Sequence, residues 1–148
     1  MIEQGANLNL PDFSGKQALH FAILGDNVEL VEFILQHGGN VNAQDVDGLT
    51  PVHYAATTGN TSVLLTLTQF GAFVNTQDHQ GETALFYAAR ERQVNALKLL
   101  LQAGADPALQ NEDEETVVEL CQELNDHALL SVFNGPVGQS AALHRKFE

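Results

Sequence analysis

Basic residues are scarce in this sequence of 148 residues. Six Lys and Arg stand against 19 Asp and Glu, which gives a formal net charge of −13 at pH 7. A chain this acidic repels phosphate backbones and anionic lipid headgroups, so we expect no binding to nucleic acid and no direct binding to membranes. The acidity favours a protein or peptide partner with a basic segment, or it serves solubility alone.

Cysteine and long apolar runs are also lacking. The single cysteine, Cys121, excludes an internal disulfide framework and is typical of a reducing compartment. No apolar run is long enough to span a membrane, and residues 1–5 lack the basic and apolar blocks of a signal peptide. These absences predict an intracellular, cytoplasmic protein, with a nuclear location left open.

A regular spacing of 33 residues is the main positive feature of the sequence. An uninterrupted period of this length is typical of stacked repeats rather than of a single globular core. Three sets of residues recur at this interval: Asp12, Asp45 and Asp78; Gly15, Gly48 and Gly81; and Gly38, Gly71 and Gly104.

The clearest unit covers residues 45–77. Thr50 and Pro51 predict the start of a helix, because a Thr hydroxyl accepts from a free backbone N–H and Pro loses no hydrogen bond at the first position. Gly59 breaks this helix, and Gly71 ends a second one. The polar segment after Gly71 predicts a hairpin-like turn, called a finger below. Each unit buries its apolar side chains only by stacking on its neighbours.

The order Asp-x-x-Gly-x-Thr-Pro-Val-His-x-Ala, which begins at Asp45, resembles the ankyrin-repeat signature. The resemblance implies an all-α repeat solenoid of stacked helix-turn-helix units with β-hairpin-like fingers. It extends over residues 1–134 as a single domain, followed by a flexible tail or linker at 135–148. The domain divides into a partial repeat at 1–11, full repeats at 12–44, 45–77 and 78–110, and a degenerate capping repeat at 111–134.

Three departures from the repeat pattern each lead to a structural prediction. Thr68 takes the place of Leu35 and Leu101, so we expect a buried hydroxyl that either bonds to the carbonyl four residues earlier or destabilises the fold. Residues 90–93 lack the glycine of the turn between the helices, so we expect a less sharp turn there. The partial repeat at 1–11 lacks its two helices, which favours a fragment of a longer protein.

Residues with catalytic or metal-binding chemistry form no recognisable constellation. His20 and His53 share one repeat position, and the resemblance implies that they order the turn through hydrogen bonds between helix and finger. No Cys and His cluster offers the three or four convergent ligands of a zinc site. Cys121 lies among apolar helix residues, which predicts a buried, unreactive thiol. We expect no cofactor and no enzymatic activity.

Partner contacts in ankyrin proteins usually come from the finger tips and the exposed side of the first helix of each unit. Phe13, Leu24, Val46 and Leu49 are apolar at such positions, which favours a protein-binding surface rimmed by acids, although single exposed apolar residues are common. Carried over residue by residue, the candidates on the fingers are Phe13, Ser14, Lys16, Val46, Asp47, Leu49, His79, Gln80, Glu82, Glu112, Asp113 and Glu115, and those on the first helices are Leu24, Thr57, Thr58, Arg90 and Glu91.

Asn42 and Asn75 are candidate hydroxylation sites, again by resemblance. In ankyrin proteins an oxygen-dependent asparaginyl hydroxylase can modify the asparagine at this position, usually with a leucine eight residues earlier. Leu67 meets this condition for Asn75, whereas Ile34 meets it only in part for Asn42. The alternative is that both side chains only bond across the turns.

Taken together, these features predict a protein–protein interaction module in a scaffold, adaptor or regulatory protein. The alternative is a stand-alone small ankyrin inhibitor that masks a basic surface of its partner. The identity of the partner and the oligomeric state are left open.

Overall fold

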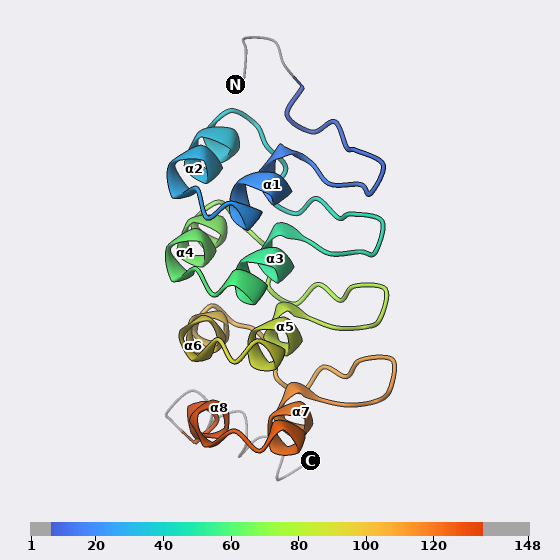
Figure 1. Ribbon diagram of the computed structural model, residues 1–148, viewed down its shortest axis with the longest axis vertical. Helices are drawn as coiled ribbons and strands as arrows, with labels where there is room; N and C mark the ends of the chain where they lie inside the picture. The colour runs from blue at the N-terminus through green and yellow to red at the C-terminus, as the bar shows by residue number, and fades with distance from the viewer. Residues whose placement is uncertain (1–6, 135–148) are drawn as a thin grey trace.

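The computed structural model describes residues 7–134. Within that range the chain forms helices and turns without a strand, as predicted for an all-α repeat solenoid. Four helix-turn-helix pairs stack in one direction, with the fingers projecting beside the column of first helices (Figure 1). The helices are α1 (Ala18–Leu24), α2 (Val28–Gln36), α3 (Pro51–Thr58), α4 (Thr61–Gln69), α5 (Ala84–Arg90), α6 (Val94–Gln102), α7 (Val117–Leu124) and α8 (His127–Val132).

The helix starts follow the capping residues of the sequence. Thr50 precedes α3 and its hydroxyl accepts the backbone N–H of His53 at 3.5 Å. The capping box predicted for α7 is present: the Thr116 hydroxyl accepts the Glu119 N–H at 3.3 Å, and a Glu119 carboxylate oxygen accepts the Thr116 N–H at 3.1 Å. These bonds satisfy backbone donors that a helix leaves free at its start.

The connection between α5 and α6 covers residues 91–93, one residue more than the connection at 59–60 between α3 and α4, and it keeps the left-handed conformation without the glycine. Arg92 takes the left-handed conformation at φ 57°, as Gly59 does at φ 76° one repeat earlier. A non-glycine residue pays about 1–2 kcal/mol in this conformation. The Arg92 guanidinium lies 2.7 Å from the carboxylate of Asp126 in the next repeat, and this ion pair offsets part of that cost.

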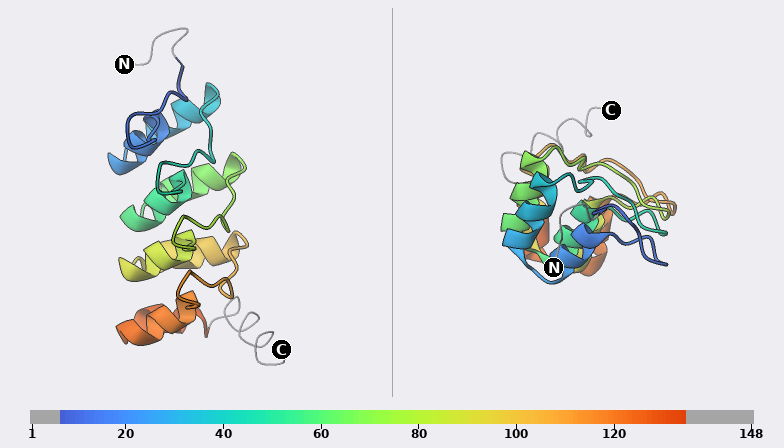
Figure 2. Two further views of the ribbon diagram at one scale, coloured as in Figure 1. Left: turned by 90° about the vertical axis from the view of Figure 1, so that its right-hand side faces the viewer. Right: turned by 90° about the horizontal axis from the view of Figure 1, so that it is seen from above.

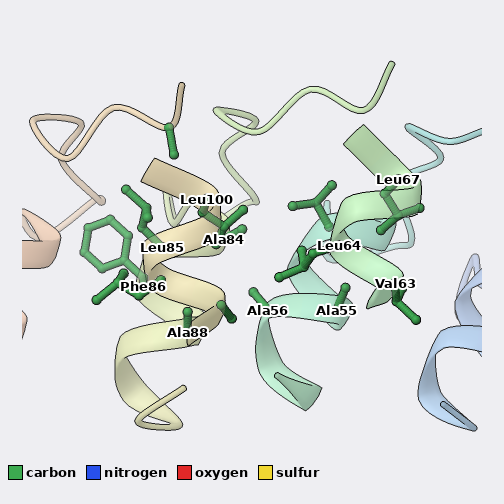
Figure 3. Close-up of a cluster of buried hydrophobic side chains, with 14 of the residues drawn as sticks. Ala55, Ala56, Val63, Leu64, Leu67, Ala84, Leu85, Phe86, Ala88 and Leu100 are labelled. Atoms are coloured by element: carbon green, nitrogen blue, oxygen red, sulfur yellow. The ribbon is translucent and has the colours of Figure 1, made fainter. Parts of the chain in front are cut away.

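The core lies between successive helix pairs. Small side chains such as Ala55 and Ala88 let the first helices approach closely, and both are fully buried. Leu64 and Leu67 of α4 fill the space between the two columns (Figure 3). Truncation of such a buried leucine to alanine costs roughly 2–5 kcal/mol.

Thr68 is half-buried, so the prediction of a buried hydroxyl is wrong. Its side chain is shorter than those of Leu35 and Leu101, which are buried at the equivalent positions, and it leaves its hydroxyl near the surface. That hydroxyl donates to the carbonyl of Leu65, three residues earlier, at 2.7 Å. The buried threonine of α4 is Thr66 instead, and its hydroxyl donates to the Ser62 carbonyl at 2.9 Å.

None of the helices in residues 7–134 combines the length and the apolar character needed to cross a bilayer. The expected tail at 135–148 and most of the partial repeat lie outside the described residues.

Candidate functional site

Each finger is held in shape by the acidic or amide residue at its base. The repeats at 12–44, 45–77, 78–110 and 111–134 are numbered 1 to 4 below. In repeat 2 one carboxylate oxygen of Asp45 accepts the backbone N–H groups of Asp47 and Leu49, both at 2.9 Å. The hydroxyl of Tyr54 on α3 donates to the other carboxylate oxygen. Asp12, Asp78 and Asn111 bind the backbone of their own fingers in the same way. The fingers are therefore ordered turns rather than strands, and their tips project at defined places.

Neighbouring fingers are bonded to one another along the stack. The N–H of Val46 donates to the Ser14 carbonyl at 2.9 Å, and that of His79 donates to the Asp47 carbonyl at 3.0 Å. The N–H of Glu112 donates to a carbonyl of the preceding finger in the same manner, at 2.9 Å. Seen from above, the fingers lie over one another on one side of the helices (Figure 2). The tips thus form one continuous, ordered surface.

The tip residues change in character along the stack. Phe13 and Val46 are exposed apolar side chains on the first two fingers. His79 and Glu112 are exposed at the equivalent positions of the third and fourth. We call the surface formed by the eight tip residues the finger surface; its residues are Phe13, Ser14, Val46, Asp47, His79, Gln80, Glu112 and Asp113.

Glu82 does not belong to this surface, so its prediction as a partner contact is wrong. Only 6% of the residue is exposed, because Arg90 of α5 folds over it. The guanidinium nitrogens lie 3.1 and 2.6 Å from the two carboxylate oxygens, and the Asn111 amide donates at 3.4 Å. Glu82 therefore stabilises the joint between repeats 3 and 4, and Arg90 is engaged by it.

The other candidates are exposed to different degrees. Leu24 at the end of α1 and Glu91, the residue directly after α5, are exposed and can reach a partner. Thr57 and Thr58 are half-buried, and their hydroxyls donate to helix carbonyls at 3.0 and 3.1 Å. Leu49, Lys16 and Ser14 are half-buried. The Lys16 ammonium donates to the Ser14 hydroxyl at 3.1 Å. Glu115 is half-buried beside the acidic tips of the fourth finger.

His20 and His53 make the helix-to-finger bonds that the resemblance implies. The Nδ1 atom of His53 accepts the backbone N–H of Thr50 at 3.0 Å, and its Nε2–H donates to the Glu82 carbonyl at 2.9 Å. His20 makes the matching bond to the Ala43 carbonyl at 3.1 Å. Burial lowers the pKa of both imidazoles, because the charged form loses hydration. Both side chains are thus structural joints between repeats.

Comparison with known families agrees with this architecture. A family model described as ankyrin repeats (3 copies) matches residues 38–111, and a second, described as ankyrin repeats (many copies), matches residues 1–55. The chain belongs to the ankyrin-repeat family. A comparison with curated proteins gave no match. Ankyrin repeats are general protein–protein interaction modules, and proteins built from them are generally not catalysts.

Asn75 and Asn42 of this ankyrin domain both bond across repeats. The Asn75 amide oxygen accepts the Asp106 N–H at 2.7 Å, and its amide nitrogen donates to the Gly104 carbonyl at 3.2 Å. The Asn42 oxygen accepts the N–H of Phe73 at 2.9 Å. Asn75 is exposed and Asn42 is half-buried, so a modifying enzyme reaches Asn75 more readily. Hydroxylation of either residue stays a prediction.

Cys121 is fully buried in α7 of the ankyrin stack. Burial, with a smaller contribution from the Asp126 charge, raises the pKa of its thiol to about 11. A neutral thiol without solvent access is a poor nucleophile. No group of three potential metal ligands occurs among residues 7–134.

One apolar surface of the ankyrin domain was not predicted from the sequence. An open groove of about 460 Å³ lies at the first helix pair. Leu30 stands 33 residues before Val63, so the sequence places both at the same position of the repeat. Val63 is buried in the structure, whereas Leu30 is exposed. The residues that line the groove are Ala18, Phe21, Ala22, Gly25, Asn27, Leu30 and Ile34.

Proposed function

We propose that the finger surface binds a protein or peptide that presents apolar side chains next to a basic segment. The carrying observation is the change of the tip residues from Phe13 and Val46 to Glu112 along one ordered row. An apolar contact area rimmed by charge is typical of protein interfaces. The change in character also sets an order: the apolar part of the partner lies on the first two fingers and the basic part on the fourth.

The negative charge of the fourth finger supports a partner with a basic segment. Glu112 and Asp113 are exposed tips, and Glu115 lies next to them. Burial and the nearby carboxylate of Glu123 raise the pKa of Glu115, which means that a negative charge is disfavoured there. A lysine or arginine of a partner relieves this repulsion. Arg90 forms its ion pair with Glu82, and its charge also acts on Glu115.

A non-catalytic binding role as scaffold, adaptor or regulator follows from such a surface. The alternative, a small inhibitor that masks a basic surface of its partner, uses the same residues. The two roles differ in the partner's state: an inhibitor suppresses the activity of the bound protein, whereas a scaffold leaves it intact. The acidity disfavours nucleic acid as the ligand.

A display selection tests the proposal directly. The full chain is immobilised and panned against a library of random peptides. We expect enrichment of Lys or Arg together with Leu or Phe. Binding of the selected peptides should then be weaker to the variant Glu112→Lys/Asp113→Lys and unchanged for Glu29→Lys/Glu32→Lys, a matched pair of charge reversals on α2.

Three results would contradict the proposal. Selected peptides without basic residues would remove the role of the acids. Equal loss of binding in both double variants would show a general charge effect rather than a site on the fingers. Selection of peptides that bind only the α2 variant poorly would place the site on the second helices.

A further inference from the structure

The connections that lead from each second helix to the following finger are bonded to one another along the stack. The Asn42 amide oxygen accepts the Phe73 N–H at 2.9 Å. One repeat further on, the Asn75 amide oxygen accepts the Asp106 N–H at 2.7 Å. Seen from above, these connections run along the edge of the fingers that faces away from the first helices (Figure 2). They form an ordered surface that is separate from the finger surface.

Repeat 2 departs from its neighbours in this row at Phe73. The equivalent residues, Asn40 and Asp106, stand 33 residues before and after it. The Asn40 side chain accepts the backbone N–H two residues later at 3.0 Å, and the Asp106 carboxylate does the same at 2.9 Å. Such a bond stabilises a turn, and a phenyl ring has no acceptor for it. Repeat 2 therefore has an aromatic ring where its neighbours have a turn-stabilising polar group.

The ring of Phe73 also lies at the surface. The residue is 66% exposed, and Phe70, three residues earlier in the same connection, is 39% exposed. Repeats 1 and 3 have His37 and Ala103 at the position of Phe70. Neighbouring exposed aromatic side chains are typical of protein-binding surfaces. We call the surface formed by Phe70, Phe73 and Asp106 the outer loop surface.

Charge indicates what kind of partner fits this surface. Asp106 is exposed, and neither ion pair found among residues 7–134 involves it. Its backbone is bonded to Asn75, only two residues after Phe73, so the carboxylate and the ring lie on adjacent connections. A guanidinium can stack on an aromatic face and pair with a carboxylate at the same time. The net charge of −13 disfavours a second copy of this chain as the occupant.

We infer that the outer loop surface binds an arginine-bearing segment of a partner protein. The guanidinium lies between the Phe73 ring and the Asp106 carboxylate, and an apolar side chain beside it packs on Phe70. This site and the finger surface lie on different faces, so both can be occupied together, as in an adaptor that holds two partners. The inference does not depend on the binding proposed for the finger surface.

The double variant Phe70→Ala/Phe73→Asn removes both rings without changing the net charge. Each new residue is the one that a neighbouring repeat has at the same position, Ala103 in repeat 3 and Asn40 in repeat 1. We expect a urea midpoint equal to or above that of the unchanged chain, because the new asparagine can cap its turn as Asn40 does. The variant therefore separates binding from folding.

Peptide selection tests the binding. The full chain with Glu112→Lys/Asp113→Lys, which alters the finger surface, is immobilised and panned against random peptides. We expect selected peptides with Arg next to Leu or an aromatic residue, and binding to Phe70→Ala/Phe73→Asn that is at least about tenfold weaker than to the unchanged chain. Leu65→Ala, which truncates an exposed apolar side chain of α4, is the matched control and should leave the affinity unchanged.

Asp106→Asn tests the guanidinium contact, because asparagine keeps an acceptor for the turn. It should weaken binding of a selected peptide but not of the same peptide with Arg replaced by Leu. Peptides selected for the finger surface should bind Phe70→Ala/Phe73→Asn as they bind the unchanged chain, so failure of one proposal is distinguishable from failure of the other.

Selected peptides without arginine, or with equal affinity for Phe70→Ala/Phe73→Asn and the unchanged chain, would overturn the inference. A lower urea midpoint of that variant would also overturn it, since the two rings would then have a structural role. Sedimentation of the unchanged chain as a dimer that the variant dissociates would assign the surface to a second copy instead. Stronger peptide binding by Arg145→Gln/Lys146→Gln would assign it to the chain's own basic residues, again against the inference.

Discussion

His53 and Glu82 are joined across two repeats by a hydrogen bond of 2.9 Å from the imidazole Nε2–H to the backbone carbonyl oxygen. The other ring nitrogen accepts the backbone N–H of Thr50 at the start of its own helix. The ring can make both bonds only as the neutral tautomer with the proton on Nε2. A single side chain therefore caps a helix and holds the next finger in place.

Acidification should destabilise the domain near the ordinary imidazole pKa. Burial lowers the pKa of His20 and His53 below 6.5, so the unfolded chain binds more protons as the pH falls through that value. The free energy of unfolding should therefore decrease from about pH 7 to about pH 5.5. Denaturant midpoints across this range measure it. The carboxyl of Asp126, whose pKa is lowered from 3.8, loses its contribution only at lower pH.

The variant His53→Asn should reduce this pH dependence, because it removes a group whose pKa is lowered by burial. A midpoint that is constant or rises on acidification would contradict the assignment of buried neutral histidines.

Thr83→Val should raise the free energy of unfolding by about 1 kcal/mol. The Thr83 hydroxyl is buried and has no hydrogen-bond partner among residues 7–134, because Phe86 stands where repeat 2 has His53. Valine keeps the shape and removes the unsatisfied hydroxyl. Urea unfolding of both proteins measures the difference.

Thr50→Val is the contrasting variant, because the Thr50 hydroxyl lies 2.8 Å from the His53 ring and caps α3. It should lower the free energy of unfolding by about 1 kcal/mol. Equal effects of the two substitutions would show that the hydroxyl of Thr83 finds a partner in solution.

Arg90→Met should destabilise the domain by about 1–2 kcal/mol, because it leaves the Glu82 carboxylate buried without its ion pair. The loss is small because the Arg90 side chain is 42% exposed, so that solvent screens its charge. The double variant Arg90→Met/Glu82→Leu should recover most of the loss, since repeat 2 has Leu49 at the position of Glu82. Thermal and urea unfolding of the unchanged protein, both single variants and the double variant measure the coupling between Arg90 and Glu82. Losses of stability that simply add would contradict it.

Charge and apolar contacts should affect different rate constants of partner binding. Glu112→Lys/Asp113→Lys should slow association and weaken its salt dependence, because rim charges steer the encounter. Phe13→Ala should speed dissociation by the equivalent of about 1–2 kcal/mol if the ring is an anchor. Association kinetics at low and high salt, with a peptide from the selection, separate the two. A peptide whose association and dissociation rate constants are unchanged by all three substitutions binds at another site.

Asn75 should gain the mass of one oxygen atom on incubation with an asparaginyl hydroxylase, oxygen and the reducing co-substrate that takes up the second oxygen atom, and Asn42 should be modified less. Asn75 is exposed and follows Leu67 by eight residues, whereas Asn42 is half-buried and follows Ile34. Mass spectrometry of the peptides around each residue measures the modification, with Asn75→Ala as the control. Preferential modification of Asn42 would contradict the accessibility argument.

The sequence by itself determined the repeat architecture of this protein. The 33-residue period, the Thr50–Pro51 helix start and the capping box of Thr116 and Glu119 are signals that lie within a few residues of the structure they specify. The place of each finger is local as well, because Asp45 binds the backbone of its own turn. Such features are readable from the chain alone.

Exposure was decided only by the tertiary structure. Glu82 looks like a finger tip in the sequence, but Arg90, which lies on α5 after the turn, covers it. Arg92 adopts a glycine-like conformation, as Asp26, Gly59 and Asn125 do at the same repeat position, and its ion pair reaches Asp126, one repeat away. Leu30 has the same repeat position as Val63 yet lies open, since burial depends on the helices stacked above it and not on the residue itself.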